Sequence, residues 1–561
     1  MNCKERILSN DYADVILDYA LPDERLAELG YEYCFSNIDD EFRIVFLDRQ
    51  EVMPISTSVY TYASIPKLYG LMQTFQADNL VETGNLQIQG PPLSLKGRGV
   101  IIGFVDTGIR YQLDVFRNES GGSRILSIWD QTIQNGEPPE GFLYGTEYTR
   151  EDIDRALQSQ DPLDVVPTND ENGHGTAMAS TAAGSILNQG LSFRGAAPEV
   201  DIAVVKLKGA KQYLRDYYMI ADNAAAYQEN DIMEAVKYLE RMAGVFQRPV
   251  VIVLGIGTNM GDHRGNSPLS SYLGKIAVKR SRAVVVCGGN EGDKEHHYSA
   301  AMPEEVEMRV EENTKGFCME LWGDRVDIYS VRLRTPGGEV TPVIDFRNGS
   351  DSNYDFLFDR TLIYTRSSLT EKRSGNELIF LRFQNPTPGI WTIIVSPSGE
   401  ERVRGSGHFH IWLPITEFVD GGVYFLEPNP NVTLTEPSNA QNVITVSTYN
   451  GITGSWFSES GRGFTADDLV KPDFAAPGVQ VSTILGSRTG SSMAAALTAG
   501  CVAQFMEWSI VEGYAPYGGS RSIKSLFIRG AVRENNVTYP DERWGYGKLN
   551  ISGTFEALAR T

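Results

Sequence analysis

Between residues 96 and 300, short apolar runs alternate with stretches of helical character. The predicted strands are Val100–Val105, Ile202–Leu207, Val250–Leu254 and Ala283–Cys287. The predicted helices follow His174 and cover Asp231–Ala243 and Leu269–Ser281. Strands that are apolar throughout are buried on both faces, and their alternation with helices is typical of a parallel sheet. The pattern therefore predicts an α/β fold in which helices flank a parallel sheet.

Residues 305–425 follow a different pattern, with strand-like runs separated by Gly and Pro turns. The clearest runs are 318–322, 326–333, 378–383 and 390–395. Short strands spaced by such turns are typical of an antiparallel β-sandwich. The α/β pattern returns from Asn442 onward. We therefore expect a jelly-roll-like β-sandwich inserted into the α/β domain.

The N-terminal segment, residues 1–76, is acidic and carries no catalytic motif. A helix is predicted at Pro22–Leu29, followed by a hairpin of residues 31–36 and 42–47. These elements indicate a small α+β unit. The predicted division is 1–76, 77–304 for the first part of the α/β domain, 305–425 for the insertion, and 426–561 for the second part.

Composition and charge narrow the function classes. Of the 561 residues, 41% are hydrophobic and 22% are charged, which is ordinary for a globular protein. A net charge of −22 argues against nucleic-acid binding, which needs basic patches. The N-terminus lacks the apolar stretch of a secretory signal, and no run of about 18 apolar residues suggests a membrane span. We expect an intracellular protein without nucleic-acid or membrane partners.

The five cysteines are scattered, and no C-x-x-C or Cys/His cluster appears. This spacing predicts neither a disulfide framework nor a zinc site, so no metal site is expected. Cys287 and Cys501 lie in apolar runs and are expected to be small core residues.

Three polar residues stand in unusual neighbourhoods. Asp106 ends an apolar run, His174 lies between two glycines before a small-residue helix, and Ser492 begins the predicted helix Met493–Met506. They supply the orienting group, the general base and the nucleophile of a reactive serine. The alternatives are a turn-forming Asp and a helix-capping Ser. Metal binding by His174 is disfavoured because no second ligand stands three or four residues away.

A fourth candidate is Asn290, which follows the strand 284–287 within Gly288-Gly289-Asn290-Glu291-Gly292. An asparagine amide there can donate to a developing oxyanion, a contribution worth about 10²–10³ in turnover. The alternative is a plain Asn-containing turn.

In the order Asp, His, Asn and Ser, these motifs resemble the subtilisin-like serine proteases, the subtilases. The likeness extends to Gly255-Ile256-Gly257 and to segments 457–461, 471–478 and 544–550. It implies that Asp106 orients His174 and that His174 takes the proton of Ser492. It also implies that Asn290 and the Ser492 amide form the oxyanion hole, and that Gly255, Ile256 and Gly257 pair with an extended substrate. The chain departs from the family pattern at Ser491, where Thr is usual, and at Ala495–Leu497, where Pro is usual.

The resemblance also implies that residues 1–76 are a prodomain, which acts as a folding chaperone and inhibitor. The family's usual spacing places self-cleavage between Gln76 and Ala77, with the bond after Gln73 as the second choice. The alternative is a permanent regulatory domain that is never cut.

The absent signal, short prodomain and inserted sandwich are similar to those of the Csp-type germination proteases of spore-forming clostridia. This implies a serine endopeptidase, intracellular or spore-associated, that activates the proform of a spore cortex hydrolase and can keep its prodomain bound. No cofactor is required by the resemblance; subtilases often bind structural calcium, but no calcium motif is recognisable here. The alternatives are a catalytically silent or sensing pseudoprotease and a broad-specificity subtilase.

Overall fold

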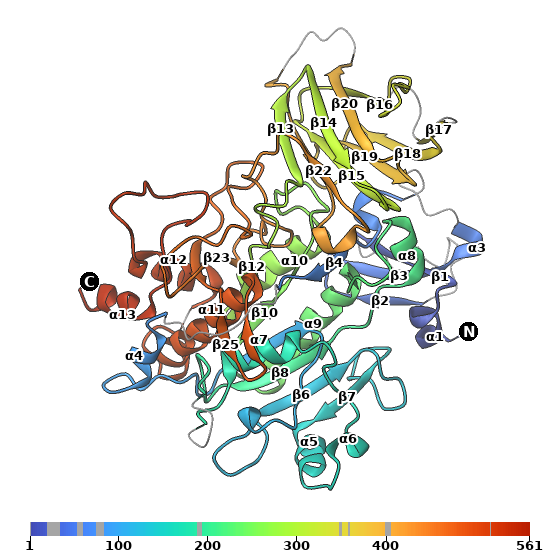
Figure 1. Cartoon of the computed structure of the whole chain (residues 1–561). Helices are drawn as coiled ribbons and strands as arrows, with labels where there is room; N and C mark the ends of the chain where they lie inside the picture. Colours follow the sequence, from blue (N-terminus) through green and yellow to red (C-terminus); the bar gives the residue numbers. More distant parts are fainter. Residues whose placement is uncertain are drawn as a thin grey trace.

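The computed structural model of the chain (Figure 1) describes nine stretches of the sequence. They are residues 2–18, 34–52, 60–73, 83–187, 193–346, 351–356, 359–398, 405–516 and 518–560.

The centre of the molecule is an eight-stranded sheet with the order β24-β23-β12-β10-β5-β8-β6-β7. Its strands are β5 (Ile101–Asp106), β6 (Ile125–Asp130), β7 (Thr146–Thr149), β8 (Asp201–Lys206), β10 (Val250–Leu254), β12 (Arg282–Cys287), β23 (Ile444–Tyr449) and β24 (Phe474–Pro477). Neighbouring strands are parallel except β6 and β7. The four predicted strands coincide with β5, β8, β10 and β12 to within one residue. The α/β prediction is therefore confirmed.

Helices cover both faces of this sheet. In β10, Val250 and Ile252 share one hydrophobic core with α9 and α10, whereas Val251 and Val253 share the other with α7 and α11. The helices of the α/β domain are α4 (Asn85–Gln89), α5 (Arg150–Leu157), α6 (Pro162–Val165), α7 (His174–Ala183), α8 (Gln212–Tyr217), α9 (Glu229–Val245), α10 (Pro268–Ala277), α11 (Ser491–Met506), α12 (Ser520–Gly530) and α13 (Ile551–Ala559). The carboxyl ends of the parallel strands are where an α/β fold places its site.

Helix α11 continues through a π-helical turn, Glu507–Val511. By length and composition the stretch Ser491–Val511 could cross a membrane, but 83% of its apolar window is buried inside the protein. That burial is typical of a core helix.

The inserted module consists of two antiparallel sheets, seen in yellow and green at the top of Figure 1. One has the order β13-β21-β15-β19-β18-β17 and the other β16-β20-β14-β22. The strands are β13 (His297–Ala301), β14 (Glu304–Val310), β15 (Gly316–Gly323), β16 (Tyr329–Arg334), β17 (Asp351–Phe356), β18 (Thr361–Ser368), β19 (Glu377–Gln384), β20 (Gly389–Pro397), β21 (His408–Trp412) and β22 (Val423–Phe425). Phe317 and Phe383 from the first sheet share a core with Met308 and Trp391 from the second. Because β13 pairs with β21, the sandwich begins upstream of the predicted boundary at residue 305.

The N-terminal unit contains an antiparallel sheet with the order β1-β3-β2. Its elements are α1 (Cys3–Leu8), β1 (Tyr12–Leu17), β2 (Phe35–Asn37), β3 (Arg43–Asp48) and α3 (Arg49–Val52). The predicted hairpin corresponds to β2 and β3, which pair. The predicted helix Pro22–Leu29 lies outside the described residues. Further along, β4 (Leu68–Leu71) leaves this unit and enters the α/β domain.

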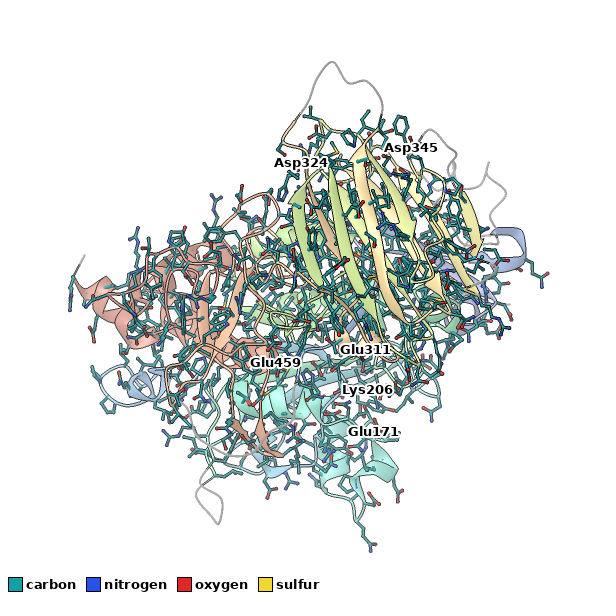
Figure 2. The ribbon with its side chains drawn as sticks, turned by 45° about the horizontal axis from the view of Figure 1, so that its top comes forward. Glu171, Lys206, Glu311, Asp324, Asp345 and Glu459 are labelled. Atoms are coloured by element: carbon teal, nitrogen blue, oxygen red, sulfur yellow. A yellow bond between two sulfur atoms is a disulfide. The ribbon has the colours of Figure 1, made fainter. Side chains whose placement is uncertain are left out.

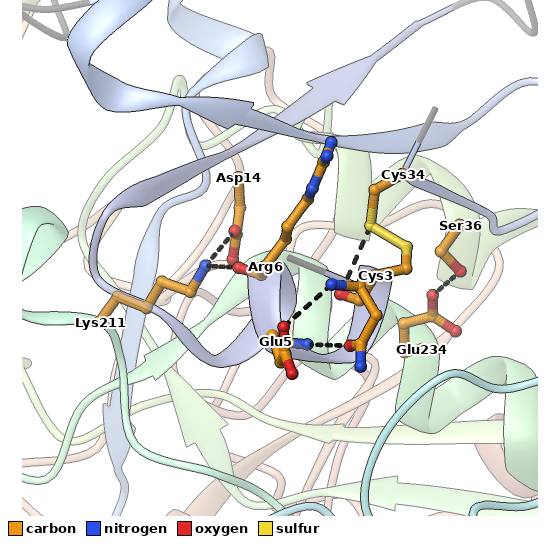
Figure 3. The surroundings of a disulfide bond; sticks show 9 residues. Cys3, Glu5, Arg6, Asp14, Cys34, Ser36, Lys211 and Glu234 are labelled. Atoms are coloured by element: carbon orange, nitrogen blue, oxygen red, sulfur yellow. Dashed lines mark hydrogen bonds and ion pairs between the residues drawn. A yellow bond between two sulfur atoms is a disulfide. The ribbon is translucent and has the colours of Figure 1, made fainter. Parts of the chain in front are cut away.

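Cys3 and Cys34 form a disulfide that ties α1 to the residue before β2 (Figure 3). The prediction of no disulfide was therefore wrong. The prediction failed because two cysteines separated by 31 residues leave no local motif in the sequence. Only the folded N-terminal unit shows that the two sulfurs are close. Cys287 and Cys501 are buried free thiols, as predicted.

Candidate active site

Asp106 and His174 form a buried pair. Asp106 ends β5, and His174 is the first residue of α7. The Nδ1 atom of His174 lies 2.7 Å from Oδ1 of Asp106, and both side chains are almost fully excluded from solvent. Gly173 caps the helix with a φ of 88°, a left-handed conformation that glycine adopts without strain.

Asp170, which the sequence did not suggest, fixes the start of α7. Its carboxylate accepts hydrogen bonds from the backbone amides of Gly173 and Thr176, each at 2.8 Å, and from the hydroxyl of Thr107 at 2.8 Å. A carboxylate that accepts from the first amides of a helix is a capping group. In the sequence, the clue to this capping role is the position of Asp170, four residues before His174.

A second contact holds the loop before α7. The Nζ atom of Lys206, at the end of β8, donates to the carbonyl of Asn169 and pairs with Glu171, both at 2.8 Å. Figure 2 shows Lys206 and Glu171 next to each other. The direction of the His174 side chain is therefore set from the strand, the loop and the helix.

The environment of His174 favours its protonated form. Burial alone would lower the pKa of His174, but the negative charge and hydrogen bond of Asp106 outweigh burial, and the pKa is raised from its ordinary value. The more distant charges of Asp170 and Glu417 act in the same direction. Such a pair stabilises an imidazolium that forms during a reaction.

Ser492 is the second residue of α11 and is fully buried. Its Oγ atom and the Nε2 atom of His174 are both buried, and neither hydrogen-bonds to any residue in the described part of the chain. Their two helices pack together, with Thr181 of α7 in contact with Met493 of α11. Buried polar atoms without partners are rare and call for an explanation such as a catalytic role.

The strand β4 runs beside these residues. It lies between β11 (Ile256–Gly257) and β9 (Tyr227–Gln228), and it is antiparallel to both. Leu71 is opposite Ile256, and Gly70 is opposite Gly257. Ile256 and Gly257, from the segment predicted to pair with substrate, are therefore paired with an extended strand of the chain itself.

Beyond β4, Met72 is held at both of its backbone polar groups. Its amide donates to the carbonyl of Gly255 at 3.0 Å, and its carbonyl accepts from the backbone amide of Ser492 at 3.3 Å. Gly490, with a φ of 145°, allows this approach, because a Cβ atom there would lie 2.5 Å from the Met72 oxygen. Gln73 is the last described residue of this stretch, and Gln76 and Ala77 lie outside the described residues.

The side chain of Asn290 is fixed next to the nucleophile's helix. Its Oδ1 atom accepts a hydrogen bond of 3.0 Å from the backbone amide of Ser491, and the residue is buried. This contact leaves its NH₂ group as the available donor. Within the described ranges, no group of three or more His, Cys, Asp or Glu side chains is arranged to hold a metal ion.

The predicted residues thus surround one segment of chain. Hydrogen bonds link Asp106 to His174, Gly255 to Met72, Met72 to Ser492, and Ser491 to Asn290. A Cβ atom on Gly255 would lie 3.0 Å from Cε1 of His174, so the imidazole is next to this segment. The sequence missed Asp170, Gly490 and the strand β4 itself.

Known proteins of one family are similar to this chain over most of its length. The subtilase family model, Peptidase S8, matches residues 97–312 and 387–547. The subtilisin-like proteases SBT3.6 and SBT3.10 of Arabidopsis thaliana are each 23% identical to the chain, over 457 and 502 residues. These matches cover 72% and 82% of this chain but only 55% and 59% of the relatives, so the chain spans little more than half of their length.

Among solved structures, the Clostridium perfringens CspB protease superimposes with a TM-score of 0.74 and 28% identity. The match covers 85% of this chain and 98% of that protein. The similarity therefore includes most of the chain rather than the α/β domain alone.

Proposed function

The chain belongs to the subtilase family, and from that premise we propose that it is a serine endopeptidase that cleaves its own N-terminal unit. The observation that carries the proposal is the hydrogen bond from the Ser492 amide to the carbonyl oxygen of Met72. It supports the proposal because the backbone amide of the nucleophile is one of the donors with which a serine protease stabilises its oxyanion.

In this mechanism the Oγ atom of Ser492 attacks the carbonyl carbon of Met72, and Nε2 of His174 takes the hydroxyl proton. Asp106 holds the imidazole in the required tautomer through Nδ1 and stabilises the imidazolium. The Ser492 amide and the NH₂ of Asn290 stabilise the negative oxygen. His174 then gives its proton to the amine of Gln73, and water hydrolyses the acyl-enzyme.

We propose Met72–Gln73 as the bond that is cut, in place of Gln76–Ala77 or the bond after Gln73. The paired register of Leu71 with Ile256 and Gly70 with Gly257 supports this choice. Bringing the Gln73 carbonyl to Ser492 would need a slip of one residue. Such a slip turns every side chain of a strand to the opposite face.

We also propose that the N-terminal unit stays bound after the cut. Asp14 of β1 pairs with Lys211 at 2.6 Å (Figure 3). Asp14 also accepts from Gln228 at 2.7 Å, and all three residues are buried. The inserted module adds Arg373, whose guanidinium pairs with Asp18 at 2.8 Å. None of these contacts needs the peptide bond at residue 72, so the unit acts as a bound partner and inhibitor.

The resemblance to the Csp-type proteases, supported by the similarity to the Clostridium perfringens CspB protease, leads us to propose limited proteolysis of one protein substrate. We propose a germination role, an intracellular or spore-associated location and no required cofactor. A silent pseudoprotease is disfavoured because Asp106, His174 and Ser492 are all present.

The test compares the purified chain with its Ser492→Ala variant by denaturing gel. The proposal predicts two fragments from the natural chain and a single band from the variant. A single full-length band from both would contradict self-processing.

A further inference from the structure

The loop of the inserted module between β21 and β22 lies against strand β4. This module loop, residues 413–419, contains Ile415 and the short helical turn η3 (Thr416–Phe418). In Figure 1 it is the short orange helical turn between the sandwich and β4. Ile415 and Phe418 are each 1% exposed.

The module loop leaves no room for a side chain at Gly70. A Cβ atom on Gly70 would lie 2.6 Å from Cδ1 of Ile415 and 3.2 Å from Cε1 of Phe418. A separation below 3.0 Å requires a displacement, and here the end of the buried Ile415 side chain would have to move. Gly70 has no positive φ, so its backbone conformation would accept any residue. Space, and not backbone conformation, is therefore what requires glycine at this position.

The module loop is fixed on two sides, so it does not yield easily. The carbonyl of Phe418 accepts from the amide of Ala221 at 2.9 Å. The amide of Thr416 donates to the buried carboxylate of Glu291, the residue after Asn290, at 3.2 Å. Glu291 is in turn bonded to His296 at 2.9 Å. The loop is thus tied to the α/β domain next to the residues of the candidate site.

We propose that Ile415 and Phe418 form a specificity wall that favours glycine at the third residue before the cleaved bond. The inference rests on the proposed function, because it takes Met72–Gln73 as that bond and β4 as a bound substrate. The neighbouring residues Tyr69 and Leu71 are buried in the opposite hydrophobic core. The substrates are therefore proteins with an extended segment of an aromatic residue, glycine and two large apolar residues before the cut.

The experiment measures the rate of self-processing in the full chain, refolded from denaturant, by gel densitometry. Gly70→Ala is expected to slow the rate by roughly tenfold or more, because an overpacked contact weakens binding by that order. Ile415→Ala should restore the rate when combined with Gly70→Ala, because it removes the side chain that the added methyl group would meet. Gly244→Ala in α9 is the matched control, since its Cβ would meet nothing within 4 Å.

The outcomes separate the two proposals. A slow Gly70→Ala variant that Ile415→Ala rescues supports the wall. The specificity wall is contradicted if Gly70→Ala processes at the normal rate, or if Ile415→Ala does not restore the rate of a slow Gly70→Ala variant. In either case the natural chain still processes itself, so the proposed function is unaffected. A natural chain as inert as Ser492→Ala would instead overturn the proposed function.

Discussion

The carbonyl oxygen of Met72 accepts a hydrogen bond from the backbone amide of Ser492, at 3.3 Å. Two segments from opposite ends of the chain therefore meet at the N-terminus of α11. The contact links the N-terminal unit to the nucleophile and makes the strand before residue 73 a bound substrate in our account.

Because the pKa of His174 is raised, we expect the rate of self-processing to fall at acidic pH. The base must be neutral to accept the proton of Ser492, so processing is lost as the pH falls through the pKa of His174. Because this pKa is raised, the loss sets in at a higher pH than the ordinary histidine value of about 6.5. The measurement is the processing rate of refolded precursor as a function of pH, and a midpoint below that value would contradict the prediction.

Removal of the Asp106 charge should move the midpoint of this pH dependence to lower pH. Asp106→Asn takes away the charge that raises the pKa of His174 and leaves the burial that lowers it. We expect a rate lower by on the order of 10⁴ and a midpoint at lower pH. Asp114→Asn is the control, since the Asp114 side chain is 77% exposed, and it should change neither quantity.

Asn290→Ala should slow self-processing by about 10²–10³ without preventing folding, because it removes one donor to the oxyanion. The rate is compared with that of Asn535→Ala, whose side chain is exposed. Equal rates for the two variants would show that Asn290 only supports the turn.

Lys211→Ala should release the N-terminal unit after processing. It leaves Asp14 as an unpaired buried charge, a loss of about 3–5 kcal/mol for a buried pair. Size-exclusion chromatography of the processed protein should show the small fragment separated from the large one. Lys315→Ala, which breaks a pair at a side chain that is 65% exposed, should leave both fragments together.

The disulfide of Cys3 and Cys34 predicts a specific alkylation pattern. Denatured but unreduced protein should take up three iodoacetamide groups, at Cys287, Cys318 and Cys501, and reduced protein should take up five. Mass spectrometry of the two samples makes the comparison. Five groups without reduction would exclude the disulfide.

Local pattern was enough to predict much of this protein. Apolar runs gave β5, β8, β10 and β12, since a strand buried on both faces needs such a run. The neighbourhoods of Asp106 and His174 predicted a pair that the structure places 2.7 Å apart. In these cases the pattern that supports each prediction lies within a few residues of the strand or side chain concerned, although Asp106 and His174 are themselves 68 residues apart.

Long-range pairing was not predictable in the same way. The strand β4 is an unremarkable apolar run, and its place between β9 and β11 depends on residues far along the chain. The Cys3–Cys34 bond also depends on contacts between residues far apart in the sequence. The same is true of the start of the sandwich at β13, before the predicted boundary. The role of Gly70 becomes visible only when Ile415 and Phe418 are placed against it.

The most direct test of the account is the mass of both fragments at the earliest times of self-processing. The account predicts a small fragment that ends at Met72 and a large fragment that begins at Gln73, with neither formed by the Ser492→Ala variant. First fragments that meet at any other bond, including Gln76–Ala77, or fragments from the Ser492→Ala variant, would contradict it.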